Sequence, residues 1–287
     1  MRTNRVFRIW GFFSAVYLVS ALLWMPVVLS GKGMSTLLNT LLIGLITFVP
    51  SVTGILFTYL VKDREGRRDF WRRALRWPSM SKKLTLGALL IFPVLNIGTY
   101  VLALLLAGRA VTFPAAAQLF TSLPLLVQFL VVEITFGALS EELGWRGYVL
   151  DELQSRWSPL SSALVLGVLW ALWHTPAFLV PGLGQYNMGG VFSVPYLSFI
   201  LSVIMASVVQ TWFYNRSGRS ILLAGFMLHF LANLSLTLMS GIFERFSMPD
   251  GYYLLSAGVS LLVLIGFSLR MVRWPQRQRL QKAETAG

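Results

Sequence analysis

Long apolar stretches separated by short polar segments make up most of this 287-residue chain. A helix that crosses the hydrocarbon of a bilayer needs about 20 mostly apolar residues. By that test the pattern predicts eight membrane-spanning helices, at about residues 9–29, 37–61, 84–107, 122–142, 159–180, 192–213, 220–241 and 252–270. The alternation over about ten residues that is typical of membrane β-strands is missing. We therefore expect an all-α, polytopic transmembrane bundle, with residues 1–287 as a single integral membrane domain.

Composition supports this class. Hydrophobic residues make up 56% of the chain and charged residues 12%, and the mean hydropathy is +0.69. Soluble globular domains carry about twice that share of charge. The chain has no cysteine, which excludes disulfides, a thiol nucleophile and thiolate metal ligands.

Basic residues predict the orientation, because Lys and Arg accumulate in short cytoplasmic loops. With eight spans and a cytoplasmic N-terminus, 21 of the 24 Lys and Arg residues fall on the cytoplasmic side. Lys32, Arg109 and Arg245 are the three on the other side. Both termini are therefore expected in the cytoplasm.

The densest basic run, residues 64–77, has the pattern of an amphipathic helix lying on the membrane surface. Its predicted apolar face holds Phe70, Trp71, Ala74 and Leu75, and its basic face holds Arg67, Arg68, Arg72, Arg73 and Arg76. We expect anionic lipid as the partner of these basic loops. The net charge of +13 is spread over several loops without a nucleic-acid-binding motif, so we expect no nucleic-acid partner.

Ionisable residues inside the apolar stretches are the candidates for function, because such side chains are costly in hydrocarbon. The two histidines of the chain, His174 and His229, both lie in predicted spans, and Glu141 ends another. Counted from the predicted turn at residues 151–159 and from the start of the seventh span, these three residues reach similar depths, nearer the cytoplasm. Helix rotation is not fixed by sequence, so this only permits a shared site.

Helical spacing adds supporting residues. Asn233 follows His229 by four positions, which places both on one helix face. Glu142 precedes Arg146 by four, which favours an ion pair and leaves Glu141 directed about 100° away. Pro176 is expected to kink the helix around His174. Two small residues, Gly144 and Gly147, permit close helix approach.

A carboxylate, two imidazoles and an amide in a wet intramembrane pocket suit hydrolysis. In that reaction Glu takes a proton from water, hydroxide attacks a carbonyl, and His or Asn donors hold the oxyanion. The chain lacks an H-E-x-x-H zinc motif, a Gly-x-Ser-x-Gly turn and an aspartate within any predicted span. Glu133 fits no part of this pattern, and its role stays open.

The order of these motifs resembles the CPBP family, which comprises type II CAAX prenyl endopeptidases and bacteriocin-processing or self-immunity (Abi) proteins. The resemblance covers about residues 120–240, expected to form the catalytic core. It rests on Glu141-Glu142-x-x-x-Arg146, on an aromatic-x-x-x-His from Trp170 to His174, and on His229-x-x-x-Asn233. Trp170 stands where the family usually has Phe, which keeps an aromatic wall.

The resemblance implies roles for these residues. Glu141 would be the general base, assisted by His174, while His229 and Asn233 would stabilise the oxyanion; the supporting residues would be Glu142, Arg146 and Trp170. A glutamate protease without a cofactor is favoured. Zinc stays open as an alternative, with Glu141, His174 and His229 as its ligands.

We therefore expect an intramembrane endopeptidase that acts on a membrane-associated or lipidated protein or peptide, including prenylated CAAX-type substrates. A bacterial plasma membrane is the expected location. Two other classes stay open: a non-catalytic membrane scaffold or immunity protein, and a proton-coupled transporter that uses the same ionisable residues as a relay.

Overall fold

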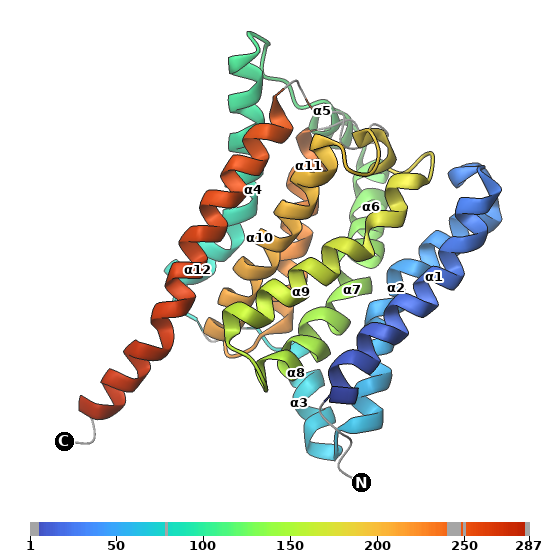
Figure 1. Ribbon diagram of the computed structural model, residues 1–287. Coiled ribbons are helices and arrows are strands. Elements are labelled where there is room, and N and C mark those ends of the chain that lie inside the picture. Colours follow the sequence, from blue (N-terminus) through green and yellow to red (C-terminus); the bar gives the residue numbers. More distant parts are fainter. Residues whose placement is uncertain (1–5, 78–79, 240–247, 249–250, 285–287) are drawn as a thin grey trace.

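The computed structural model describes residues 6–77, 80–239, 248 and 251–284, and within them every regular element is helical (Figure 1). Eight helical segments in this part of the chain are long and apolar enough to cross a membrane: Phe7–Ser30, Leu37–Val61, Lys82–Leu106, Leu123–Gln154, Pro159–Leu179, Val194–Arg216, Leu222–Met239 and Tyr252–Val272. These segments confirm the all-α bundle of eight spans expected from hydropathy.

Four of the eight spans are single α-helices, and the other four also carry short π- or 3₁₀-helical pieces, marked η. In chain order the elements are η1 (Phe7–Gly11), α1 (Phe12–Ser30), η2 (Gly33–Ser35), α2 (Leu37–Val61), α3 (Arg64–Leu75), α4 (Lys82–Leu106), α5 (Pro114–Thr121), α6 (Leu123–Val132), η3 (Glu133–Leu139), α7 (Ser140–Glu142), η4 (Leu143–Val149), α8 (Leu150–Gln154), α9 (Pro159–Trp173), η5 (Thr175–Leu179), η6 (Tyr186–Met188), α10 (Val194–Arg216), η7 (Leu222–Met227), α11 (Leu228–Met239) and α12 (Tyr252–Glu284).

Hydroxyl side chains begin several of these helices, because a side-chain oxygen can accept from a backbone N–H that has no partner within the helix. Thr36 caps α2 and Ser81 caps α4 in this way. Ser158 caps α9 and Ser193 caps α10, each just before a helix with Pro in its first turn. Proline suits that position because its missing N–H would have no intrahelical acceptor.

The fourth span is longer and less regular than expected. We predicted residues 122–142, whereas the helical segment continues to Gln154. Two π-helical pieces, η3 and η4, flank the short α7, and π-helical turns are common at functional sites. The apolar pattern underestimated this span because its second half buries polar side chains. Arg146, expected in a cytoplasmic loop, is one of them.

The bundle places the second half of the fourth span, residues 140–153, in its interior (Figure 1). Helices α1 and α2 cover one side of it, α10 packs against α9 and α12, and α11 packs against α4. Helix α2 touches η4 almost backbone to backbone, since a Cβ on Gly144 would lie 2.2 Å from the Pro50 carbonyl oxygen. This contact confirms the expected close approach at Gly144.

Helix α3 forms where the sequence predicted an amphipathic helix, at the same end of the bundle as the start of α1 and the end of α12 (Figure 1). Phe70 is buried as expected, against Gly147. The expected basic face differs at one position, since Arg73 is buried and pairs with Asp69 and Asp151. Leu75, on the expected apolar face, is 77% exposed.

Candidate active site

Glu141 lies on α7, between the two π-helical pieces, and is only 5% exposed. Its Oε2 accepts hydrogen bonds from two indoles, Trp145 Nε1 at 3.0 Å and Trp170 Nε1 at 2.6 Å. An indole N–H can only donate. These bonds therefore fix Oε2 and leave Oε1 to face another group.

His174 terminates α9, so the kink expected there is instead a helix end. The α-helix stops at Trp173, and the chain continues from Thr175 as the 3₁₀-helix η5. Pro176 accounts for the change, because it has no N–H to donate and its ring disfavours an α conformation in the residue before it. His174 is thereby held at the helix terminus.

The ring of His174 is oriented by the backbone of its own helix. Its Nδ1 lies 2.9 Å from the Trp170 carbonyl oxygen, which can only accept, so Nδ1 carries the proton. In the neutral ring Nε2 is then an acceptor, and it lies 3.9 Å from Glu141 Oε1. Trp173 and Phe199 pack edgewise on the ring. A separation of 3.9 Å is too long for a direct hydrogen bond and suits a bridging water.

Glu142 holds a different set of partners. Its Oε1 accepts from Arg146 Nη1 at 2.7 Å and from His229 Nδ1 at 2.9 Å. The side chains of Glu142, Arg146 and His229 are 2%, 0% and 8% exposed. The ion pair expected from the four-residue spacing is confirmed, and it also orients His229, which the spacing did not predict.

Arg146 is enclosed by groups from two further helices. Its Nη2 donates to Gln210 Oε1 on α10, and its guanidinium carbon lies 4.2 Å from the centre of the Trp170 ring. Sequence reasoning missed Gln210 and Trp145. The position of Trp145, four residues after Glu141, could have revealed it, whereas Gln210 is a single polar residue in an apolar span and gave no signal.

Asn233 lies on the same helix as His229 but contacts a different neighbour. A Cβ atom on Gly137 would lie 3.1 Å from Asn233 Nδ2 and 3.3 Å from Glu133 Oε2. Glycine at 137 therefore allows the amide and the Glu133 carboxyl to approach the same point. In the described part of the chain no hydrogen bond joins Asn233 to Glu141 or to either histidine.

A catalytic zinc normally has three protein ligands at about 2.0–2.2 Å for N and O atoms. Within the described residues no three His, Cys, Asp or Glu side chains converge as such a group. Of the three ligands considered, Glu141 accepts at Oε2 from two indoles and His229 bonds Glu142 through Nδ1. Oε1 of Glu141 and Nε2 of His229 are therefore the atoms that a metal would have to use.

Comparison with known proteins agrees with the motif analysis. Residues 123–235 match the family model described as "Type II CAAX prenyl endopeptidase Rce1-like". This range contains all seven residues singled out from the sequence. The chain is also 28% identical over 214 residues to "CAAX prenyl protease 2" of Methanococcus maripaludis, which covers 74% of this chain and 78% of that relative.

The eight apolar helices and the relationship to membrane proteases indicate an integral membrane protein. This similarity supports intramembrane endopeptidase activity. The family-model match and the Methanococcus relative together support the resemblance of the chain to the CPBP family, the family of the type II CAAX prenyl endopeptidases.

Proposed function

We propose that this protein is a glutamate-type intramembrane endopeptidase in which Glu141, assisted by His174, activates the attacking water. One observation carries the proposal: Glu141 Oε1 and His174 Nε2 face each other at 3.9 Å, and both are acceptors. A water between them can donate one hydrogen bond to each, which leaves an oxygen lone pair directed at the substrate.

The reaction is balanced without another reagent. Glu141 takes one proton from water as the oxygen bonds to the scissile carbonyl carbon. The tetrahedral intermediate then collapses as the C–N bond breaks, and Glu141 returns that proton to the leaving amine. The two indole donors fix the carboxylate orientation throughout these steps.

The oxyanion is held from α11 in this proposal. Asn233 supplies a neutral amide N–H. His229 donates a hydrogen bond from Nδ1 to Glu142. Its Nε2 can therefore donate to the oxyanion only when the ring is doubly protonated.

The substrate we propose is a membrane-associated protein or peptide, including prenylated proteins of CAAX type. The printed name of the Methanococcus relative supports this class. A bacterial plasma membrane stays our proposal for location, on family resemblance. The basic loops are proposed to lie on the cytoplasmic side, with both termini.

The test is cleavage of a farnesylated CAAX-type reporter peptide by the purified full-length protein in detergent. Mass spectrometry of the products locates the cleaved bond, and the assay is repeated after extensive chelation. We expect cleavage after the prenylated cysteine that survives chelation. Loss of activity on chelation and recovery with zinc would overturn the metal-free mechanism. No cleavage of membrane-associated peptides would overturn the protease.

A further inference from the structure

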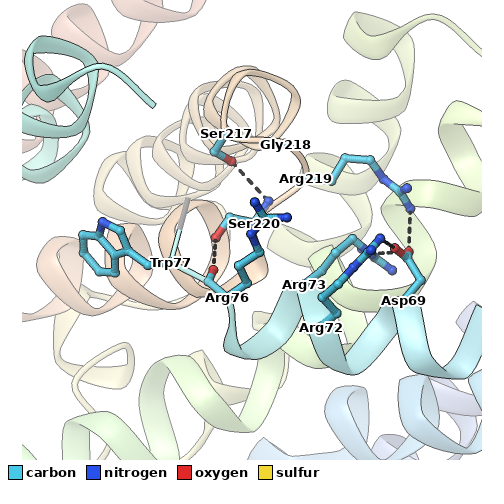
Figure 2. Close-up of a pocket in the computed structure, with 9 residues that line it drawn as sticks. All are labelled: Asp69, Arg72, Arg73, Arg76, Trp77, Ser217, Gly218, Arg219 and Ser220. Atoms are coloured by element: carbon cyan, nitrogen blue, oxygen red, sulfur yellow. Dashed lines mark hydrogen bonds and ion pairs between the residues drawn. The ribbon is translucent and has the colours of Figure 1, made fainter. Parts of the chain in front are cut away.

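A polar cavity lies at one end of the bundle, away from the candidate active site (Figure 2). It has a volume of about 190 Å³ and lies between α3, the end of α10 and the start of η7. Its lining includes four arginines, Arg72, Arg73, Arg76 and Arg219, together with Asp69 and Trp77.

The depth of this pocket is set by the spans that end beside it. Helix α10 ends at Arg216 and the next span begins at Leu222, so residues 217–220 form the turn between two membrane helices. Trp77 lies at the rim and is 53% exposed. Trp side chains concentrate at the level of lipid headgroups. The pocket therefore opens at headgroup level, on the face that carries the basic loops.

The charge of the pocket is positive even after internal pairing. Four arginines line it, while Asp69 and the neighbouring Asp151 are the two carboxylates that pair with them. Arg73 bonds both carboxylates, the Tyr214 hydroxyl and the Gly147 carbonyl. Arg219 also binds both carboxylates. These two arginines form a fixed wall.

The other two arginines keep donors for a ligand. Arg72 Nη2 donates a hydrogen bond to Asp69 Oδ1 at 2.6 Å, and the Arg72 side chain is 64% exposed. The Arg76 guanidinium has no hydrogen bond or ion pair to the residues that the structure describes. Guanidinium groups bind phosphate oxygens in a bidentate manner, and two of them in one pocket suit a phosphate group.

The pocket is also held in shape before any ligand binds. Ser220 Oγ donates to the Arg76 carbonyl at 3.2 Å, which joins the end of α3 to the start of η7. Ser217 Oγ accepts from the Ser220 N–H at 3.2 Å. Figure 2 shows both serines on the wall opposite the Asp69 cluster. A ligand would therefore meet a formed site.

We propose that this pocket binds the phosphate group of an anionic phospholipid headgroup, with Arg72 and Arg76 as its principal donors. The apolar tails would remain in the bilayer beside α10 and η7. Bound lipid would hold α3 against the bundle, because α3 contacts η4 through Arg73 and the Gly147 carbonyl. The site is separate from the proposed chemistry at Glu141.

The test uses the full-length protein in a neutral detergent and short-chain phosphatidylglycerol as the probe, with binding followed by native mass spectrometry and by thermal shift. Phosphatidylcholine and inorganic phosphate are the comparison ligands. The double variant Arg72→Gln/Arg76→Gln removes the proposed donors. Arg64→Gln/Arg68→Gln changes the net charge equally at exposed positions of α3 outside the pocket.

We expect phosphatidylglycerol to bind the wild type at least tenfold more tightly than phosphatidylcholine, and the pocket variant to lose that preference. The matched variant should keep it, and millimolar phosphate should compete weakly. Equal loss in both variants would show diffuse charge attraction and overturn the pocket. Phosphate binding as tight as the lipid would overturn the lipid as ligand. No binding preference in the wild type would overturn the site.

Discussion

Oε1 of Glu142 lies 2.9 Å from Nδ1 of His229, whereas the adjacent Glu141 directs its Oε1 at His174. Two consecutive carboxylates thus face two different histidines from two different helices. The reason is helical geometry, since neighbouring residues point about 100° apart. One carboxylate is neutralised by Arg146, and the other is held only by neutral indoles.

Glu142→Gln should destabilise the protein. The substitution keeps the shape but removes the counter-charge of the fully buried Arg146. Breaking a buried ion pair on one side costs about 3–5 kcal/mol. We expect a clearly lower midpoint of thermal unfolding in detergent, with Glu65→Gln, at an exposed position of α3, as the control. An unchanged midpoint would mean that Glu142 does not carry this charge.

Trp170→Phe removes the indole N–H and therefore tests its hydrogen bond to Glu141. The variant keeps a ring beneath Arg146 but loses the 2.6 Å bond to Glu141. Hydrogen bonds to charged groups contribute about 1.5–3 kcal/mol, so kcat should fall by roughly 10- to 100-fold.

Trp212→Phe is the matched control for that change, because the Trp212 indole N–H is buried without a hydrogen-bond partner in the described chain. It should leave kcat unchanged. If Trp170→Phe kept the wild-type kcat, as Trp212→Phe should, then Trp170 would contribute packing and not the hydrogen bond.

Gly225→Ala should disturb Glu142 from the opposite side. The added Cβ would lie 2.9 Å from Glu142 Oε2 and 3.2 Å from its Cβ. Overpacking of a well-packed site typically costs about 1–3 kcal/mol. We expect lower stability and lower activity, measured on the same preparation. Gly258→Ala is the control, since nothing lies within 4 Å of the added atom.

The attachment of α3 should depend on pH through Asp69. Burial by itself raises the pKa of Asp69, but the Arg72 hydrogen bond and the charges of Arg73 and Arg219 outweigh it and hold the pKa below its usual value. A lowered folded pKa means that this stabilisation is present above the unfolded value, about 3.9, and is lost as the pH falls through the folded pKa.

Trp71, which lies half-buried on α3, can report this attachment when its fluorescence is taken as the difference between the wild type and Trp71→Phe, because the chain has ten tryptophans. We expect this difference to be constant near neutral pH and to change in acid. Asp69→Asn should show the acid-like signal already at neutral pH and a smaller acid transition. An acid transition of the same size in the variant would assign it to another group.

The sequence predicted the spans well because hydrocarbon thickness limits their length. It failed in the fourth span, where polar residues continue the helix by pairing internally; Glu152 near its end pairs with Lys62. Within the site, four-residue spacing found the Glu142–Arg146 pair. It could not find Gln210 or the Gly137 contact of Asn233, because both depend on how separate helices rotate against one another.

The most direct test of the central claim is the single-turnover cleavage rate of Glu141→Gln on a prenylated reporter. We expect a loss of at least about 100-fold, typical of a removed general base, with an unfolding midpoint close to that of the wild type and with Glu65→Gln fully active. Cleavage by Glu141→Gln at the wild-type rate would contradict Glu141 as the residue that activates water.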